Sequence, residues 1–79
     1  MKENKKTVLV TGIGGLTPRS ITTIIRENHP DYKIIGCDID KKAMGFFMKG
    51  LLDEYYICPR CTSPEYFPWI EKLVETKKI

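Results

Sequence analysis

The chain has 79 residues, enough for one domain and near the lower limit for folding without metals or disulfides. Its hydrophobic fraction of 42% is ordinary for a globular protein, and no apolar run is long enough to span a bilayer, which excludes a membrane partner. The net charge is only +3, with many lysines near the two chain ends and no basic stripe interleaved with aromatics, so nucleic-acid binding is not expected.

The first six residues are polar and contain no apolar stretch, so they do not form a secretory signal. We expect residues 1–6 to be disordered and the protein to be cytoplasmic. The three cysteines are an odd number in a chain without a secretion signal, so structural disulfides are not expected.

The first expected strand covers residues 7–11 and is nearly continuous in β-branched and apolar side chains, as in a parallel strand covered on both faces. A glycine turn follows it. Thr17 is the expected N-cap of the next helix, and Pro18 fits the first helical position, where a missing N–H costs nothing. The expected buried stripe of this helix consists of Ile21, Ile24 and Ile25.

A second strand is expected at residues 33–38 and a third at 54–58, each followed by a helical pattern. Asp40 can cap the second helix, and Gly50 can end it in a left-handed conformation. The apolar stripe expected for the second helix is Met44, Phe47, Met48 and Leu51. The third helix is expected to start near residues 62–65. Its expected apolar stripe is Phe67, Ile70, Leu73 and Val74.

The order of elements is therefore β-α-β-α-β-α, which predicts a small three-layer Rossmann-like α/β unit with a parallel sheet and strand order 3-2-1. We expect residues 7–79 to form this domain as a fragment of a larger protein. The apolar first strand would lie at an edge of the sheet, and an open apolar edge favours association. A homodimer through that edge is one expected consequence, and a partner chain that covers it is another.

The glycine turn is the strongest candidate site. Backbone N–H groups and the helix dipole at such a turn create positive potential, which suits a small carboxylate or phosphate ligand. Arg19 in the first helical turn opposes the dipole, and an anionic ligand would make that position favourable. The residues expected to bind the anion are Gly12, Gly14, Gly15, Thr17 and Arg19. The alternative is that the glycines only shape a tight turn.

The same turn partly matches the dinucleotide fingerprint Gly-x-Gly-x-x-Gly. Gly12 and Gly14 fit the first two positions, but Thr17 stands where the third glycine is expected. Asp38 follows Thr17 by 38 − 17 = 21 positions, close to the spacing of a carboxylate that binds a ribose. The incomplete fingerprint keeps an NAD(P)-binding fragment of an oxidoreductase or epimerase as an alternative.

Cys58 and Cys61 form a single C-x-x-C pattern. A zinc site would need two more ligands, and a thioredoxin-type redox pair would need a different structural context. The simpler interpretation is two cysteines at the mouth of the sheet, so no metal site is expected. No catalytic residue is expected either, because Ser20 and Ser63 both lie at helix starts and His29 is expected to be far from each.

Residues 8–20, 33–38, 53–56, 59–60 and 63–66 together resemble the opening domain of ATP-grasp ligases, with carbamoyl-phosphate-synthase-like proteins as the nearest likeness. The resemblance covers nearly the whole chain from Thr7. It implies that the glycine turn lines the acceptor-substrate side of a cleft, and that later ATP-grasp lobes, outside these residues, bind Mg-ATP and carry out the ligation. It also implies that this chain alone does not turn over ATP and itself holds no cofactor.

Three functions therefore stay open. The chain is a substrate-binding front domain of an ATP-dependent ligase, an NAD(P)-binding fragment, or a non-catalytic module that associates with itself.

Overall fold

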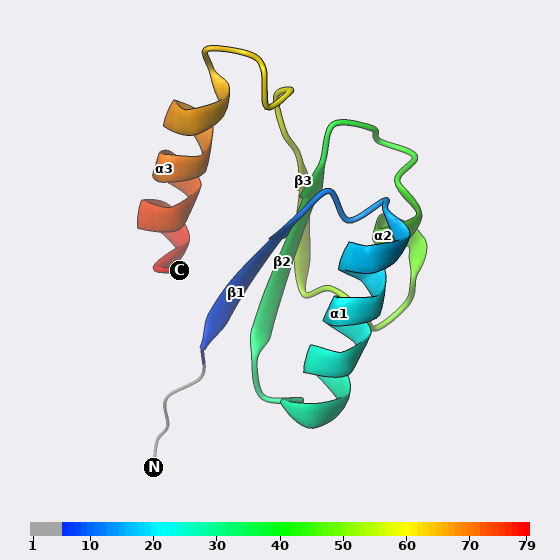
Figure 1. Ribbon diagram of the computed structural model, residues 1–79. Coiled ribbons are helices and arrows are strands. Elements are labelled where there is room, and N and C mark those ends of the chain that lie inside the picture. Colours follow the sequence, from blue (N-terminus) through cyan, green and yellow to red (C-terminus); the bar gives the residue numbers. More distant parts are fainter. Residues whose placement is uncertain (1–5) are drawn as a thin grey trace.

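We describe residues 6–79 in a computed structural model; the expectation of disorder for residues 1–5 lies outside the described residues. Three strands alternate with three helices (Figure 1). In chain order the elements are β1 (Thr7–Thr11), α1 (Leu16–Asn28), β2 (Lys33–Asp38), α2 (Met44–Phe47), β3 (Glu54–Ile57) and α3 (Tyr66–Lys77). Within residues 6–79, no helix is long and apolar enough to cross a membrane.

The strands form one parallel sheet, which confirms the expected small α/β architecture. Their order is β1-β2-β3, so β2 is central, and counting from the other edge gives the expected 3-2-1. Val10 pairs with Gly36 and Cys37 pairs with Tyr56, so the carboxyl ends of all three strands meet at one edge of the sheet. That edge is where open α/β sheets bind ligands.

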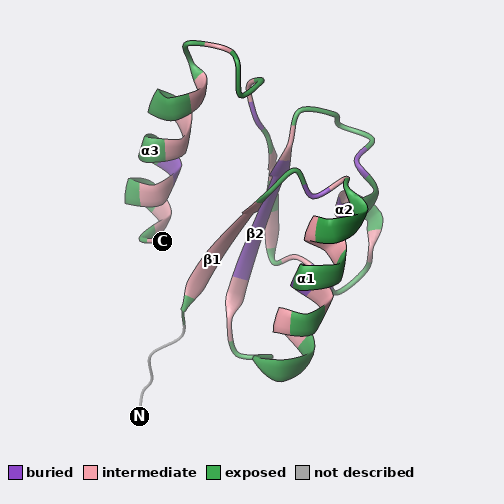
Figure 2. Cartoon of the chain, in the orientation of Figure 1, coloured by how far each residue is buried: buried purple, intermediate pink, exposed green. Residues whose placement is uncertain are grey.

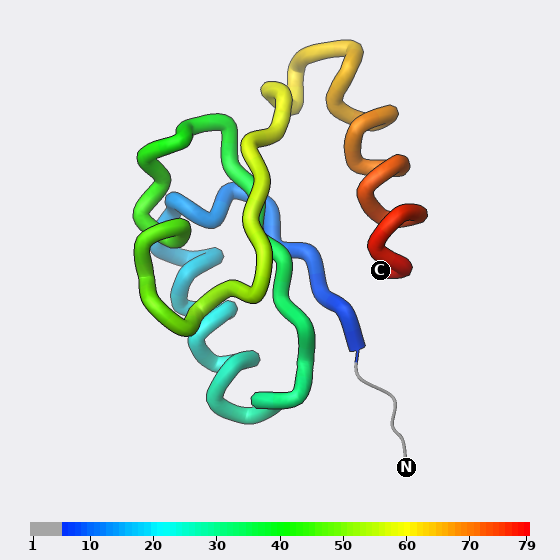
Figure 3. Tube along the Cα trace, turned by 180° about the vertical axis from the view of Figure 1, so that it is seen from behind, coloured from blue at the N-terminus to red at the C-terminus, as the bar shows by residue number. Residues whose placement is uncertain are grey.

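The helices lie on both faces of the sheet. Figures 1 and 3, from opposite sides, show α1 and α2 together on one face and α3 on the other. The Phe46 ring stacks on Tyr55 across the first face, with ring centroids 4.8 Å apart. On the second face, Lys77 of α3 lies 5.6 Å above the ring of Tyr56. Successive residues of β3 therefore face opposite helical layers, as a pleated strand requires.

The core is centred on β2, which is the most deeply buried strand (Figure 2). Ile34, Ile35 and Cys37 are fully buried, because β2 is covered by helices on both faces and by a strand on each edge. Ile13 of the glycine turn is also fully buried and packs with Ala43 and Leu51. The turn is thus held in place by its own apolar side chain.

The helix α1 differs from its expectation at two points. Its N-cap is Gly15, so Thr17 lies inside the first turn and is not the cap. The side chains of Ile21 and Ile24 are 50% and 58% exposed, whereas Thr22 is fully buried. Thr22 is accommodated there because its hydroxyl donates a 2.6 Å hydrogen bond to the carbonyl of Pro18.

The helix α2 is only one turn long, so the longer helix expected there was wrong. Of the expected apolar stripe, Leu51 is buried and Met48 packs against the core, but both lie beyond the helix. Met44 and Phe47 are 55% and 68% exposed, and the buried residue of the turn is Gly45. Asp40 does not cap α2; its side chain accepts a hydrogen bond from the Lys42 N–H within the preceding turn. Gly50 has the expected left-handed backbone, but it lies in the loop beyond the helix.

The helix α3 starts at Tyr66, later than expected, and Phe67 is 71% exposed. Leu73 is the residue of α3 that is buried against the sheet. The carboxyl end of α3 is attached to β3 by an ion pair between Lys77 and Glu54 at 3.0 Å. Glu54 also forms an ion pair with Lys33 of β2 at 2.6 Å.

Acid should weaken this attachment. Hydrogen bonds from Lys33, Tyr56 and Lys77 lower the pKa of Glu54 from 4.5 to about 2. Because the folded-state pKa is the lower one, the stabilisation is complete above 4.5 and is lost as the pH falls from 4.5 to about 2. We expect the thermal midpoint to fall in this window, and the fall to be shallower in Glu54→Gln. Glu75→Gln, an exposed control on α3, should retain the wild-type slope, and an unchanged slope in Glu54→Gln would contradict this assignment.

Candidate functional site

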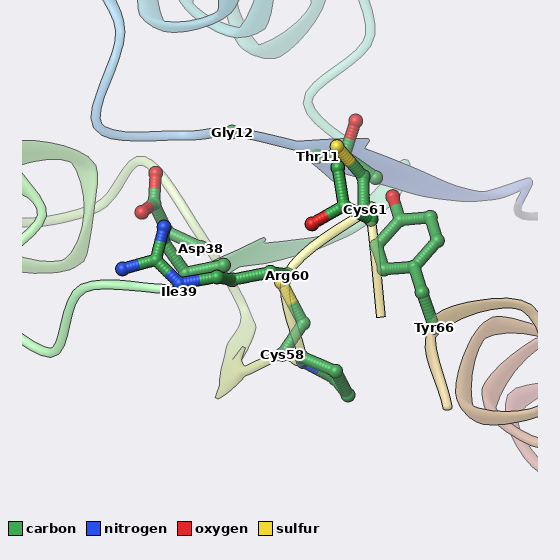
Figure 4. A pocket seen from close by; sticks show the side chains of 10 residues that line it. Thr11, Gly12, Asp38, Ile39, Cys58, Arg60, Cys61 and Tyr66 are labelled. Atoms are coloured by element: carbon green, nitrogen blue, oxygen red, sulfur yellow. The ribbon is translucent and has the colours of Figure 1, made fainter. Parts of the chain in front are cut away.

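A pocket of about 450 Å³ lies at the carboxyl edge of the sheet, between the glycine turn and the start of α3 (Figure 4). It is lined by Thr11, Gly12, Asp38, Ile39, Cys58, Pro59, Arg60, Cys61, Thr62 and Tyr66. These residues come from the ends of all three strands and from the loop before α3. The position is the one at which the topology of an open parallel sheet creates a ligand crevice.

Asp38, the last residue of β2, joins this pocket to the glycine turn. Its Oδ2 atom accepts a 2.8 Å hydrogen bond from the Gly14 N–H, and its Oδ1 atom accepts one of 3.0 Å from the Asp40 N–H. A carboxylate has about four acceptor positions, so two remain for a ligand. Asp38 therefore organises the turn and also presents acceptors to the pocket.

The amides of the glycine turn do not point outward as expected. The Ile13 N–H donates to the carbonyl of Cys37 at 3.1 Å, the Gly14 N–H donates to Asp38, and the Gly15 N–H donates to the carbonyl of Gly12 at 2.9 Å. Three consecutive amides are thus used within the fold. The first turn of a helix has no intrahelical partners for its N–H groups, so the amides left for an anion are those at Leu16 and Thr17.

Two glycines of the turn have clear structural requirements. Gly12 has φ +66°, a left-handed conformation that other residues rarely adopt, and it also lines the pocket. A Cβ atom on Gly14 would lie 3.0 Å from both Asp38 Oδ2 and the Ala43 Cβ. Gly14 therefore permits the close approach that brings its N–H to the Asp38 carboxylate.

Arg19 lies outside the pocket lining. Its Nε atom donates a 3.1 Å hydrogen bond to the carbonyl of Gly15, so the side chain folds back along α1. Gly15 and Thr17 are likewise absent from the lining. Of the six expected site residues, the structure thus brings Gly12 and Asp38 to the pocket and Gly14 to Asp38. A ligand-binding role for all six stays a prediction.

The opposite wall of the pocket carries thiols and a phenol. Burial raises the pKa of the Cys37 thiol from 9.0 to about 12, and the neighbouring Cys58 adds to the shift. Burial also raises the pKa of Tyr66, and the three nearby cysteines act in the same direction. Cys37 is therefore a neutral structural thiol at pH 7. Within residues 6–79, no three His, Cys, Asp or Glu side chains converge to hold a metal ion.

Sequence reasoning did not assign Arg60, Ile39 or Tyr66 to the site. The Arg60 side chain runs from the loop after β3 toward Asp38 in Figure 4, which brings a cation to the same pocket as the carboxylate. The sequence feature that could have indicated this side of the pocket is the Pro59-Arg60 pair within the C-x-x-C pattern, directly after the third strand. Tyr66 carried no signal, because its position depends on how the loop of residues 58–65 turns.

Comparison with known proteins gives one informative match. The chain is 40% identical over 55 residues to the prephenate dehydrogenase of Bacillus subtilis (strain 168), and the matched part is 68% of this chain. The chain spans only 15% of the length of that protein. No family model and no solved structure matches the chain.

This match corrects the resemblance to ATP-grasp ligases. The matched protein is a dehydrogenase, and nothing among the comparisons points to a ligase, an ATP-grasp fold or a carbamoyl-phosphate-synthase-like protein. The glycine loop pointed to the wrong family because many nucleotide-binding and substrate-binding domains share a β-strand, a glycine turn and a helix in this order. The match supports the alternative of an NAD(P)-binding oxidoreductase fragment better than the ligase.

Proposed function

We propose that this chain is a Rossmann-like NAD(P)-binding unit of an oxidoreductase and that it binds the adenosine half of the cofactor at the carboxyl edge of its sheet. The observation that carries the proposal is the shared pocket of Gly12 and Asp38, two positions of the dinucleotide fingerprint that lie far apart in sequence. The match to a dehydrogenase supports it independently.

The pocket has the chemistry for this ligand. Its volume of about 450 Å³ is within the range of about 300–1,000 Å³ typical of small-molecule sites. The two free acceptor positions of Asp38 suit ribose hydroxyl groups, and the apolar surface of Ile39 and Pro59 suits a base. The free amides of Leu16 and Thr17 lie at the start of α1, outside the pocket lining, and suit a pyrophosphate that extends from the pocket.

The chain would supply binding and orientation, and the nicotinamide would supply the hydride chemistry. Within residues 6–79 we assign no catalytic residue, since the residues that line the pocket include no histidine. The substrate-binding and proton-transfer groups of an oxidoreductase would then come from polypeptide outside the described residues.

A titration with NADH and with NADPH tests the proposal. Trp69 is the only tryptophan and lies on α3, so energy transfer from its indole to the reduced nicotinamide reports binding. We expect a saturable signal that ADP-ribose competes away, because the proposed site holds the adenosine half. Absence of saturation with both cofactors would contradict the proposal.

The variant Arg60→Ala distinguishes the two cofactors. An arginine beside the acidic residue accommodates a 2′-phosphate, and a carboxylate favours a free 2′-hydroxyl. The variant should bind NADPH about tenfold more weakly, because it loses one hydrogen bond to a charged group. Its affinity for NADH should be unchanged. Lys72→Ala on α3, outside the pocket, is the matched control for loss of a positive charge.

A further inference from the structure

The C-x-x-C pattern lies along the wall of the proposed cofactor pocket, and both of its cysteines line the cavity (Figure 4). Both are free thiols, but they differ in access: Cys58 is only 8% exposed, whereas Cys61 is an exposed residue. An accessible thiol that is followed or preceded closely by a protected one suits a two-step oxidation. The first cysteine reacts with an external oxidant, and the second resolves the product.

Cys58 has a second cysteine neighbour, Cys37 of β2, but the sheet keeps the two backbones apart. Cys37 pairs with Tyr56, so Cys58 lies two residues further along the same face. Strand spacing and rise per residue then place the Cα atoms of the two cysteines about 8 Å apart, beyond the reach of a disulfide. Cys37 is fully buried in the central strand and cannot move toward Cys58.

The backbone between Cys58 and Cys61 is held less firmly. The Cys58 N–H donates a 2.9 Å hydrogen bond to the carbonyl of Asp38, which fixes that residue to the end of β2. Pro59 has no N–H, and within residues 6–79 the N–H groups of Arg60 and Cys61 donate no hydrogen bond. A bend in this segment can therefore occur without loss of a hydrogen bond from these groups, while the sheet stays in place.

We propose that Cys58 and Cys61 form a modification site at which a low-molecular-weight disulfide such as oxidised glutathione installs a Cys58–Cys61 disulfide, and that this disulfide weakens cofactor binding. The Cys61 thiolate attacks one sulfur of the external disulfide and displaces the first glutathione thiolate, which leaves a mixed disulfide on Cys61. The Cys58 thiolate then attacks the Cys61 sulfur and displaces the second. The protein loses two protons and two electrons, and glutathione gains them as two thiols.

The effect on the cofactor rests on the proposed function. Pro59 and Arg60 stand between the two cysteines, so closure of the disulfide ring bends the backbone that carries them. Pro59 belongs to the apolar surface proposed for the base, and the Arg60 side chain runs toward Asp38 (Figure 4). The disulfide therefore displaces both from their places in the pocket. By linkage, a bound cofactor opposes formation of the disulfide by the same factor by which the disulfide weakens its binding.

Peptide mapping tests the modification site without a cofactor. The chain is equilibrated with oxidised and reduced glutathione, alkylated under denaturing conditions and digested with trypsin, which cleaves after Arg60. We expect a disulfide that joins the two tryptic peptides holding Cys58 and Cys61, with Cys37 alkylated. Cys58→Ser should accumulate the mixed disulfide on Cys61, Cys61→Ser should form neither product, and Cys37→Ala should behave as the wild type. A wild-type chain in which Cys61 stays free or stops at the mixed disulfide, or in which Cys37 is cross-linked, would overturn the site.

Cofactor titration of the same samples tests the regulation. NADH and NADPH should bind the oxidised wild type at least about tenfold more weakly than the reduced one, and dithiothreitol should restore binding. Cys61→Ser, treated in the same way, is the matched control and should keep its affinity. Equal affinity of the oxidised and reduced wild type would overturn the effect on the pocket. If the reduced chain binds neither cofactor, the proposed function fails and the regulation fails with it, whereas the mapped disulfide still supports the modification site.

Discussion

Asp38→Ala should lose both folding stability and cofactor affinity. The substitution removes the acceptor of the Gly14 and Asp40 N–H groups, and a partly buried N–H without a partner costs about 1–3 kcal/mol. We expect the free energy of unfolding to fall by about 2 kcal/mol. NADH affinity should fall by about tenfold or more, since the variant also lacks the acceptors proposed for the ribose.

Denaturant unfolding and NADH titration of the same samples separate the two effects. Asp40→Ala is the matched control, because it removes a neighbouring carboxylate that caps only a surface turn. It should leave NADH affinity within a factor of about two, the scale of effects outside the site. Normal NADH binding by a folded Asp38→Ala variant would show that the carboxylate is structural only.

Gly45→Ala should be among the most destabilising single substitutions in this chain. A Cβ atom at this position would clash with Ile13 Cγ1 and lie 2.5 Å from the Ile13 carbonyl oxygen. The backbone of the glycine turn would have to move, and overpacking of this kind costs about 3 kcal/mol. Because Ile13 anchors the turn that holds Gly12 and Gly14, we also expect weaker cofactor binding.

Gly36→Ala provides the comparison. A Cβ atom at position 36 would lie 2.7 and 3.0 Å from the two terminal methyl carbons of Leu52, and the Leu52 side chain can rotate away. We expect a loss of about 1 kcal/mol or less. Chemical denaturation of both variants measures the difference, and an equal loss of stability in the two would contradict the view that α2 clamps the turn through Ile13.

The strands could be read from the sequence because their signal is local. Residues 7–11 are nearly continuous in apolar and β-branched side chains, and residues 33–38 contain the apolar Ile34, Ile35 and Cys37; the structure has strands with both sets of bounds. The helix faces could not be read as well. A stripe of isoleucines on α1 predicts burial, but the buried residue is Thr22. Ile21 and Ile24 are exposed and lie about 100° and 160° around the helix from it.

The candidate site was only half accessible to sequence reasoning. Gly12 and Asp38 were found through their spacing, which reflects a recurring arrangement of strand, turn and helix. The direction of the Gly14 N–H was mistaken, because its acceptor is 24 residues away in the chain. Arg60 and Tyr66 reach the pocket through an irregular loop, and no periodicity encodes where such a loop places its side chains.

The most direct measurement of cofactor binding is a titration of the 15N-labelled chain with NADH, followed by amide chemical shifts. We expect saturable changes confined to the turn at Gly12, to Ile39 after β2 and to Arg60 in the loop before α3, with Leu16 and Thr17 affected by the pyrophosphate. Saturable changes centred instead on Trp69 and Lys72 of α3, or no changes at all, would contradict a nucleotide site at the carboxyl edge of this sheet.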